Sequence, residues 1–153
     1  MKRCIMIIVG ALALPCLALT GFDADFDAVA KRAKASSKPM FVLFTGSDWC
    51  SWCVKLEKEV FSKREFLDYA TNAWELAVVD FPRKKTVDDG VKMRRRELMR
   101  KYSISGFPTV LLLDGNGKTL RRGGYCAGGA KAWLERFNRG REISPSAGKP
   151  SKQ

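Results

Sequence analysis

The 153-residue sequence contains no histidine. This absence excludes Ser-His-Asp hydrolysis, Cys-His proteolysis, catalysis at a His-ligated zinc ion, and haem attachment through Cys-x-x-Cys-His. Any chemistry must therefore use cysteine, carboxylate, lysine or tyrosine side chains. Acidic residues are also few, because 16 Asp and Glu stand against 28 Lys and Arg, for a formal net charge of +12. The length and the hydrophobic content of 46% are typical of one globular domain.

Cysteine is too sparse for a disulfide-dense scaffold, and a chain of this length buries a core without such cross-links. The five cysteines are Cys4, Cys16, Cys50, Cys53 and Cys126. We therefore expect the cysteines that remain in the mature protein to serve chemistry more than architecture.

The N-terminus has the layout of a secretory signal peptide, which we assign to residues 1–20. Two basic residues precede an apolar stretch over residues 5–19, which Pro15 interrupts. The alternative of a retained anchor is weaker, because a membrane span needs about 20 uninterrupted apolar residues. Lipidation of Cys16 is disfavoured, because Pro15 stands where a small residue is expected. We predict export to the bacterial periplasm, with secretion as the alternative.

Hydrophobic periodicity predicts an α/β domain over residues 21–140. Helical spacing of apolar residues predicts helices over residues 22–33, 50–61, 63–70, 86–102 and 130–137. Apolar runs and a hairpin turn predict strands over residues 40–44, 74–81, 109–113 and 118–122. This pattern favours a central mixed sheet of about four strands, with a parallel core, an antiparallel hairpin and helices on both faces. Residues 141–153 have little to bury and are predicted to form a disordered basic tail.

Cys50 and Cys53 form a Cys-x-x-Cys pair between the first strand and the helix that follows it. Free N–H groups and the positive end of the helix dipole stabilise a thiolate at Cys50, the residue nearest the helix start. Cys53 lies one turn inside the helix, close enough to attack a mixed disulfide. The pattern therefore predicts Cys50 as the nucleophile and Cys53 as the resolving thiol.

Other uses of the cysteine pair remain open or are disfavoured. A structural zinc site and an iron–sulfur cluster each need four ligands, and only Cys126 could join the pair. We therefore expect no metal and no cofactor. One alternative is a non-catalytic binding module in which the Cys50–Cys53 disulfide is structural and the basic surface binds a partner. Another is a copper-handling protein, since Cu(I) accepts soft thiolates.

The segment Trp49-Cys50-Ser51-Trp52-Cys53, between a buried strand and a helix, resembles the thioredoxin family. A second segment, Ile104-Ser105-Gly106-Phe107-Pro108-Thr109, is similar to the family segment that carries a cis proline. The resemblance implies a thioredoxin-like fold and protein-disulfide oxidoreductase activity on client proteins, with an unidentified redox partner. It also implies that Pro108 is the cis proline and that Phe107 contacts the substrate. We interpret Trp49 and Trp52 as an apolar rim for substrate docking.

The match is closest to exported single-domain members of the family, which have Gly-Ser-Asp-Trp-Cys before the helix. Two departures concern proton transfer: Ser51-Trp52 replaces Gly-Pro between the cysteines, and Phe44 stands at the position of a buried Asp. The proton route and the reduction potential are therefore not carried over. Asp48 is expected to be solvated, and close to Cys50 its charge would oppose the thiolate.

The remaining signals are weaker. Arg83-Lys84-Lys85 and the basic run over residues 94–101 are expected to be solvated surface, with attraction to acidic partners or an anionic membrane as the alternative. Cys126 is expected to be a small buried hydrophobe, with a third thiol for an intermolecular bridge as the alternative. We expect a monomer that binds no nucleic acid and meets the membrane only through its signal segment.

Overall fold

The structure is a computed structural model that describes residue 19 and residues 21–140. Its sheet has four strands in the order β2-β1-β3-β4. The strands are β1 (Met40–Thr45), β2 (Glu75–Asp80), β3 (Thr109–Leu113) and β4 (Thr119–Gly123). The helices are α1 (Phe26–Ser36), α2 (Ser51–Leu56), the π-helical turn η1 (Glu57–Phe61), α3 (Arg64–Ala73), α4 (Asp89–Lys101) and α5 (Gly129–Asn138).

In the part of the chain so described, none of the helices has the length and apolarity that crossing a membrane requires. Apart from residue 19, the predicted signal segment, which contains Cys16, lies outside the described residues, as does the predicted tail.

The four-stranded mixed sheet confirms the predicted fold class, but the predicted parallel core is wrong for the third strand. β1 pairs with β2 in parallel, whereas β3 runs antiparallel to β1 and to β4. The connection through α4 therefore returns the chain in the opposite direction. The sheet has one parallel pair of strands, and the rest of its pairing is antiparallel.

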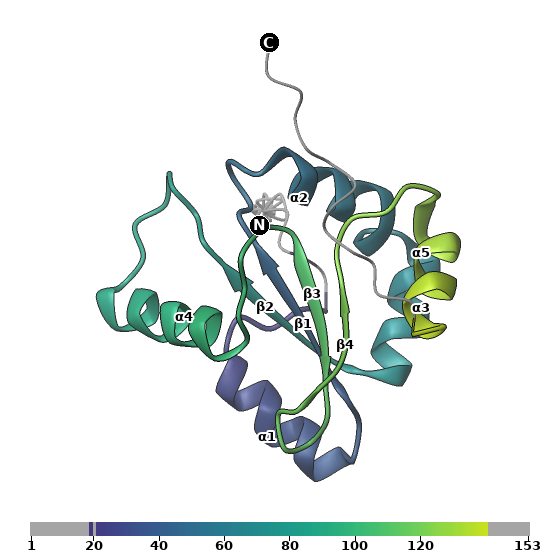
Figure 1. Ribbon diagram of the computed structural model, residues 1–153, viewed down its shortest axis with the longest axis horizontal. Coiled ribbons are helices and arrows are strands. Elements are labelled where there is room, and N and C mark those ends of the chain that lie inside the picture. The colour runs from purple at the N-terminus through teal and green to yellow at the C-terminus, as the bar shows by residue number, and fades with distance from the viewer. Residues whose placement is uncertain (1–18, 20, 141–153) are drawn as a thin grey trace, which may run out of the picture.

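Two layers of helices cover the sheet. Figure 1 shows α1 and α4 on one side of the sheet and α2, α3 and α5 on the other. The central strand β1 is buried along its whole length, because its alternate side chains enter two different cores. Phe41 and Leu43 join the core under α3 and α5, whereas Val42 and Phe44 join the core under α1 and α4.

The chain before α1 crosses from one face of the sheet to the other, which corrects the prediction of a helix from residue 22. Asp23 forms an isolated parallel bridge with Ala77. Asp25 then caps α1, and its carboxylate accepts the Ala28 N–H at 3.0 Å. Phe22 consequently packs against the α3–α5 core, whereas Phe26, the first residue of the helix, packs in the α1–α4 core.

Two other helices differ from their predicted form. The helix expected over residues 50–61 begins at Ser51 as α2 and widens into the π-helical turn η1 after Leu56. The helix expected from residue 86 begins at Asp89, because the Asp88 carboxylate accepts the Gly90 N–H at 2.8 Å and caps α4 there. Helix periodicity located both helices and their last residues to within one residue, but not the π-helical turn or the beginning of α4.

Candidate active site

Cys50 and Cys53 are joined by a disulfide. The pair lies where α2 begins, which is the place that the helical spacing after Cys50 predicts. Cys50 is the residue that caps α2, and its Sγ accepts the Cys53 N–H at 3.2 Å. The side chains are almost buried, with 8% of Cys50 and 4% of Cys53 exposed. After reduction, the same N–H donor would stabilise negative charge on the Cys50 sulfur. Cys50, the more exposed residue of the pair, is therefore also the one whose sulfur accepts a hydrogen bond at the helix start.

The loop before Cys50 is shaped by close contact between Gly46 and Trp49. A Cβ atom at Gly46 would overlap the indole of Trp49. The absence of a side chain lets the indole lie against the backbone and donate from Nε1 to the Phe81 carbonyl at 2.7 Å. Asp80 fastens the same loop by accepting from the Ser47 N–H at 2.9 Å and the Ser47 hydroxyl at 2.6 Å. Two hydrogen-bonded links thus join this loop to the end of β2.

Asp48 is not merely solvated, which corrects the expectation from the sequence. Its carboxylate accepts the backbone N–H groups of Arg83 at 2.9 Å and of Lys84 at 2.8 Å. These two donors are the main reason that the pKa of Asp48 lies below its usual range. The ionised Asp48 therefore holds the loop after β2 in place, and its lowered pKa makes it a poor substitute for a proton-transferring acid.

Trp49 is the centre of one aromatic group, the Trp49 cluster, formed by Trp49, Phe81, Phe107 and Arg83. Its ring centroid lies 5.7 Å from that of Phe107, in an edge-to-face arrangement, and the Phe107 centroid lies 5.2 Å from that of Phe81. The Arg83 guanidinium carbon lies 4.0 Å from the centroid of the Trp49 ring. The Phe107–Pro108 peptide bond is cis, as the resemblance implies.

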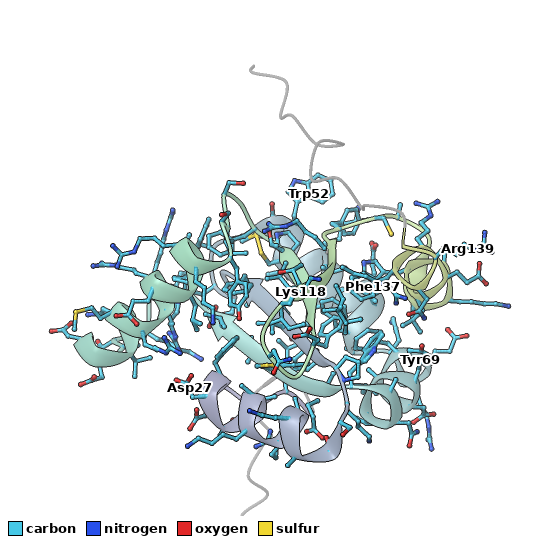
Figure 2. The ribbon with its side chains drawn as sticks, turned by 60° about the horizontal axis from the view of Figure 1, so that its bottom comes forward. Asp27, Trp52, Tyr69, Lys118, Phe137 and Arg139 are labelled. Atoms are coloured by element: carbon cyan, nitrogen blue, oxygen red, sulfur yellow. A yellow bond between two sulfur atoms is a disulfide. The ribbon has the colours of Figure 1, made fainter. Side chains whose placement is uncertain are left out.

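Trp52 belongs to a second group, the Trp52 cluster, formed by Trp52, Tyr125, Lys55 and Glu59. Its side chain projects outward from the beginning of α2 (Figure 2) and is 44% exposed. The Trp52 and Tyr125 centroids are 4.9 Å apart, and the Lys55 ammonium lies 5.3 and 5.2 Å from them. The Tyr125 hydroxyl donates to Glu59 at 2.8 Å. Exposed aromatic surface thus lies on both sides of Cys50 in the chain.

The loop after β4 is held against the cis-proline segment. A Cβ atom at Gly124 would lie 3.2 Å from the Pro108 carbonyl oxygen, so the two backbones approach closely. The Gly124 carbonyl accepts the Trp133 Nε1–H at 2.9 Å. Cys126, in the same loop, is a free and half-buried thiol whose pKa is raised by burial. Cys126 was expected to be buried, and the structure shows it only partly buried.

Glu57 has the one raised pKa among the carboxyl groups that the structure describes. Burial is the main cause, and the charge of Asp80 adds to it. Glu57 lies four residues after Cys53, one helical turn further along. Hydrophobic periodicity does not single out Glu57, although its spacing of four residues from Cys53 is a usable signal. Tyr125 and the Arg83 contact with Trp49 were also missed, and sequence periodicity carries no signal for either.

The basic run on α4 is partly paired with acidic side chains of α1 and α4. Arg94 binds Asp27 of α1 at 2.6 Å and Glu97 at 3.2 Å, so it links the two helices on that face. Asp27 lies at the beginning of α1, on the side of α4 (Figure 2). Within residues 21–140, no group of three or more Cys, Asp or Glu side chains is arranged as a metal site.

Replacing Gly46 with Ala is expected to displace the Trp49 indole and break its hydrogen bond to Phe81. Overlap of this kind in a packed site costs typically 1–3 kcal/mol, so the free energy of unfolding should fall by about that amount. Urea unfolding measures it. The matched control is Gly106→Ala, because a Cβ atom there has no neighbour within 4 Å. Equal stability losses in the two variants would contradict the packing role of Gly46.

Comparison with known proteins gives consistent matches. A family model described as a thioredoxin-like domain matches residues 26–138. The disulfide bond reductase DsbH of Chlamydia pneumoniae is 34% identical over 106 residues, which are 69% of this chain and 64% of that protein. This chain thus spans slightly less than two thirds of that relative's length. The thioredoxin-related protein DsbJ of Chlamydia pneumoniae is 25% identical over 98 residues, 64% of this chain and 28% of that protein.

A solved structure of DsbH oxidoreductase matches this chain with a TM-score of 0.73 and 30% identity, covering 78% of this chain and 82% of that one. A putative disulphide-isomerase from Bacteroides thetaiotaomicron matches with a TM-score of 0.53 and 27% identity, covering 84% of this chain and 97% of that one.

Proposed function

The chain belongs to the thioredoxin-like domain family, and on that premise we propose that it exchanges disulfides with client proteins through Cys50 and Cys53. The observation that carries the proposal is the Cys50–Cys53 disulfide at the beginning of α2, with the Cys53 N–H donating to the Cys50 sulfur. The name of the relative DsbH, disulfide bond reductase, favours the reducing direction.

In that direction the reaction has two exchange steps. The Cys50 thiolate attacks one sulfur of a client disulfide, so a Cys50–client disulfide forms while the other client sulfur leaves as a thiolate and takes a proton. The Cys53 thiolate then attacks the Cys50 sulfur and releases the second client thiol. Two electrons have passed to the client, and the protein is left with the Cys50–Cys53 disulfide seen here. A dithiol redox partner must reduce it again.

Four side chains are proposed to contact the client: Trp49, Trp52, Phe107 and Pro108. Trp49 and Trp52 are 37% and 44% exposed on either side of the nearly buried Cys50 in the chain. Phe107 touches the Trp49 ring, and its backbone is proposed to pair with an extended client segment. The lower exposure of Cys53 supports its assignment as the resolving thiol.

We further propose that this exchange takes place outside the cytoplasm, in a bacterial periplasm. The signal-like composition of residues 1–20 supports export, and a disulfide persists in an oxidising compartment. The proposed mature protein is a monomeric thioredoxin-like domain over residues 21–140 with a basic tail over residues 141–153. Contact with the membrane is proposed for the signal segment alone, before it is removed.

The reduction potential of the Cys50–Cys53 couple tests the proposal. The protein is equilibrated in thiol/disulfide buffers, free thiols are trapped by alkylation, and each cysteine is read by mass spectrometry, with Cys126→Ser as the background. A potential of roughly −120 to −270 mV is expected, towards the more negative end for a reductase. A potential below about −300 mV would instead identify a structural bridge and support a non-catalytic binding module.

A further inference from the structure

The Arg83 side chain occupies an unusual position beside the disulfide loop. Its guanidinium carbon lies 4.0 Å from the centroid of the Trp49 ring, which is the ring next to Cys50 in the chain. A guanidinium group that stacks on an aromatic ring uses its face for that contact. Its N–H donors lie in the plane of the group, so they stay available for a hydrogen-bond acceptor at its edge.

The backbone of Arg83 and the Trp49 ring beside its guanidinium are both fixed by other contacts. The Arg83 N–H donates to Asp48 at 2.9 Å, and the adjacent Lys84 N–H donates to the same carboxylate at 2.8 Å. The Trp49 indole is held by its hydrogen bond to the Phe81 carbonyl at 2.7 Å. The cation is therefore positioned before any ligand arrives, which reduces the entropy lost on binding.

Arg83 nevertheless has no acidic partner within the described part of the chain. Its guanidinium lies within 4.0 Å of no carboxylate there, whereas Arg32 and Arg94 each bind two. The nearby acid, Asp48, is occupied by two backbone N–H groups. In the Trp52 cluster the corresponding cation, Lys55, already has a carboxylate of Glu59 at 3.9 Å. Arg83 is thus an exposed, preorganised cation whose charge is not neutralised within the protein.

We propose that Arg83 binds a carboxylate side chain of the client, so that the site favours disulfides whose cysteine is flanked by Asp or Glu. This inference rests on the proposed disulfide exchange. A client segment placed on Phe107 lies beside the Trp49 ring, because the two ring centroids are 5.7 Å apart, and the Arg83 guanidinium carbon lies 4.0 Å from the centroid of the same Trp49 ring. The planar fork of Arg matches the two oxygens of a carboxylate.

The test compares two peptide disulfides that differ only in Glu or Gln beside the cysteine. The reduced protein is expected to prefer the Glu peptide in kcat/KM by about 5- to 10-fold at low ionic strength, mainly through KM, because a charge-assisted contact is modest at an exposed site and weakened by salt. In Arg83→Gln the preference should fall below about 2-fold, while Arg83→Lys keeps part of it, since charge remains and the fork is lost.

Lys85→Gln is the matched control, because it removes one positive charge from the same exposed segment at a residue with no aromatic contact in the structure. It should keep the wild-type preference. Equal losses in Arg83→Gln and Lys85→Gln, or no preference in the wild type, would overturn the role of Arg83. Bis(2-hydroxyethyl) disulfide, which carries no charge, distinguishes failure of this inference from failure of the proposed exchange. If the wild-type protein reduces it but shows no preference between the Glu and Gln peptides, only the inference about Arg83 is refuted. If the protein reduces none of the three disulfides, the proposed exchange itself is refuted.

Discussion

A Cys53→Ala variant is expected to accumulate disulfide-linked complexes with client proteins through Cys50. The first exchange step needs only the Cys50 thiolate, whereas release of the client needs a second thiol in the same molecule. Groups held in position react with effective concentrations far above those of thiols in solution, so removing Cys53 should slow release by several orders of magnitude. Complexes that run separately on a non-reducing gel and collapse on reduction would show the trapped state.

The controls for this trap are the double variant Cys50→Ala/Cys53→Ala, which should form no complex, and the single variant Cys50→Ala. In the latter the remaining thiol of Cys53 is less exposed, so we expect far fewer complexes. A Cys126→Ser background removes the half-buried third thiol from the readout. If Cys53→Ala gave no complex with a disulfide-containing extract, or gave as many as Cys50→Ala, the assignment of Cys50 as the nucleophile would be wrong.

The features predicted well from the sequence are those that depend on neighbours in the chain. The buried strand β1 follows from an unbroken apolar run, and the Cys-x-x-Cys pair is placed at the beginning of α2 by the helical spacing after Cys50. The family matches confirm the thioredoxin-like resemblance that these two local patterns, with the Pro108 segment, supported. Local patterns were sufficient because a strand followed by such a helix start is specific to few folds.

The features that the sequence did not predict depend on residues far apart in the chain. Asp48 accepts N–H groups that lie 35 and 36 positions away, and nothing in its own surroundings indicates them. Trp52 meets Tyr125 only because the loop after β4 lies beside the cis-proline segment. The direction of β3 likewise depends on how α4 returns the chain to the sheet. Periodicity reports which side of an element is buried, but not which distant element covers it.

Replacing Trp133 with Ala is expected to cause the largest loss of stability of any substitution considered. Its side chain is fully buried and lies in aromatic contact with Phe61 at 5.4 Å and Phe137 at 4.7 Å between ring centroids. Truncation of a buried aromatic side chain to Ala costs about 3–5 kcal/mol, because packing is lost and a cavity remains. Urea or thermal unfolding would measure the change, and a loss below about 1 kcal/mol would contradict the core assignment.

Trp133→Phe separates packing from the hydrogen bond that Trp133 makes to the loop after β4. The phenyl ring keeps much of the aromatic packing but leaves the Gly124 carbonyl without its donor, at a cost of about 1–3 kcal/mol. Because Gly124 lies against the Pro108 carbonyl and precedes Tyr125, the loosened loop should slow exchange with protein disulfides more than with small disulfides. Equal slowing for both substrates would mean that the substitution slows exchange by lowering the stability of the whole domain, and not by loosening the loop after β4.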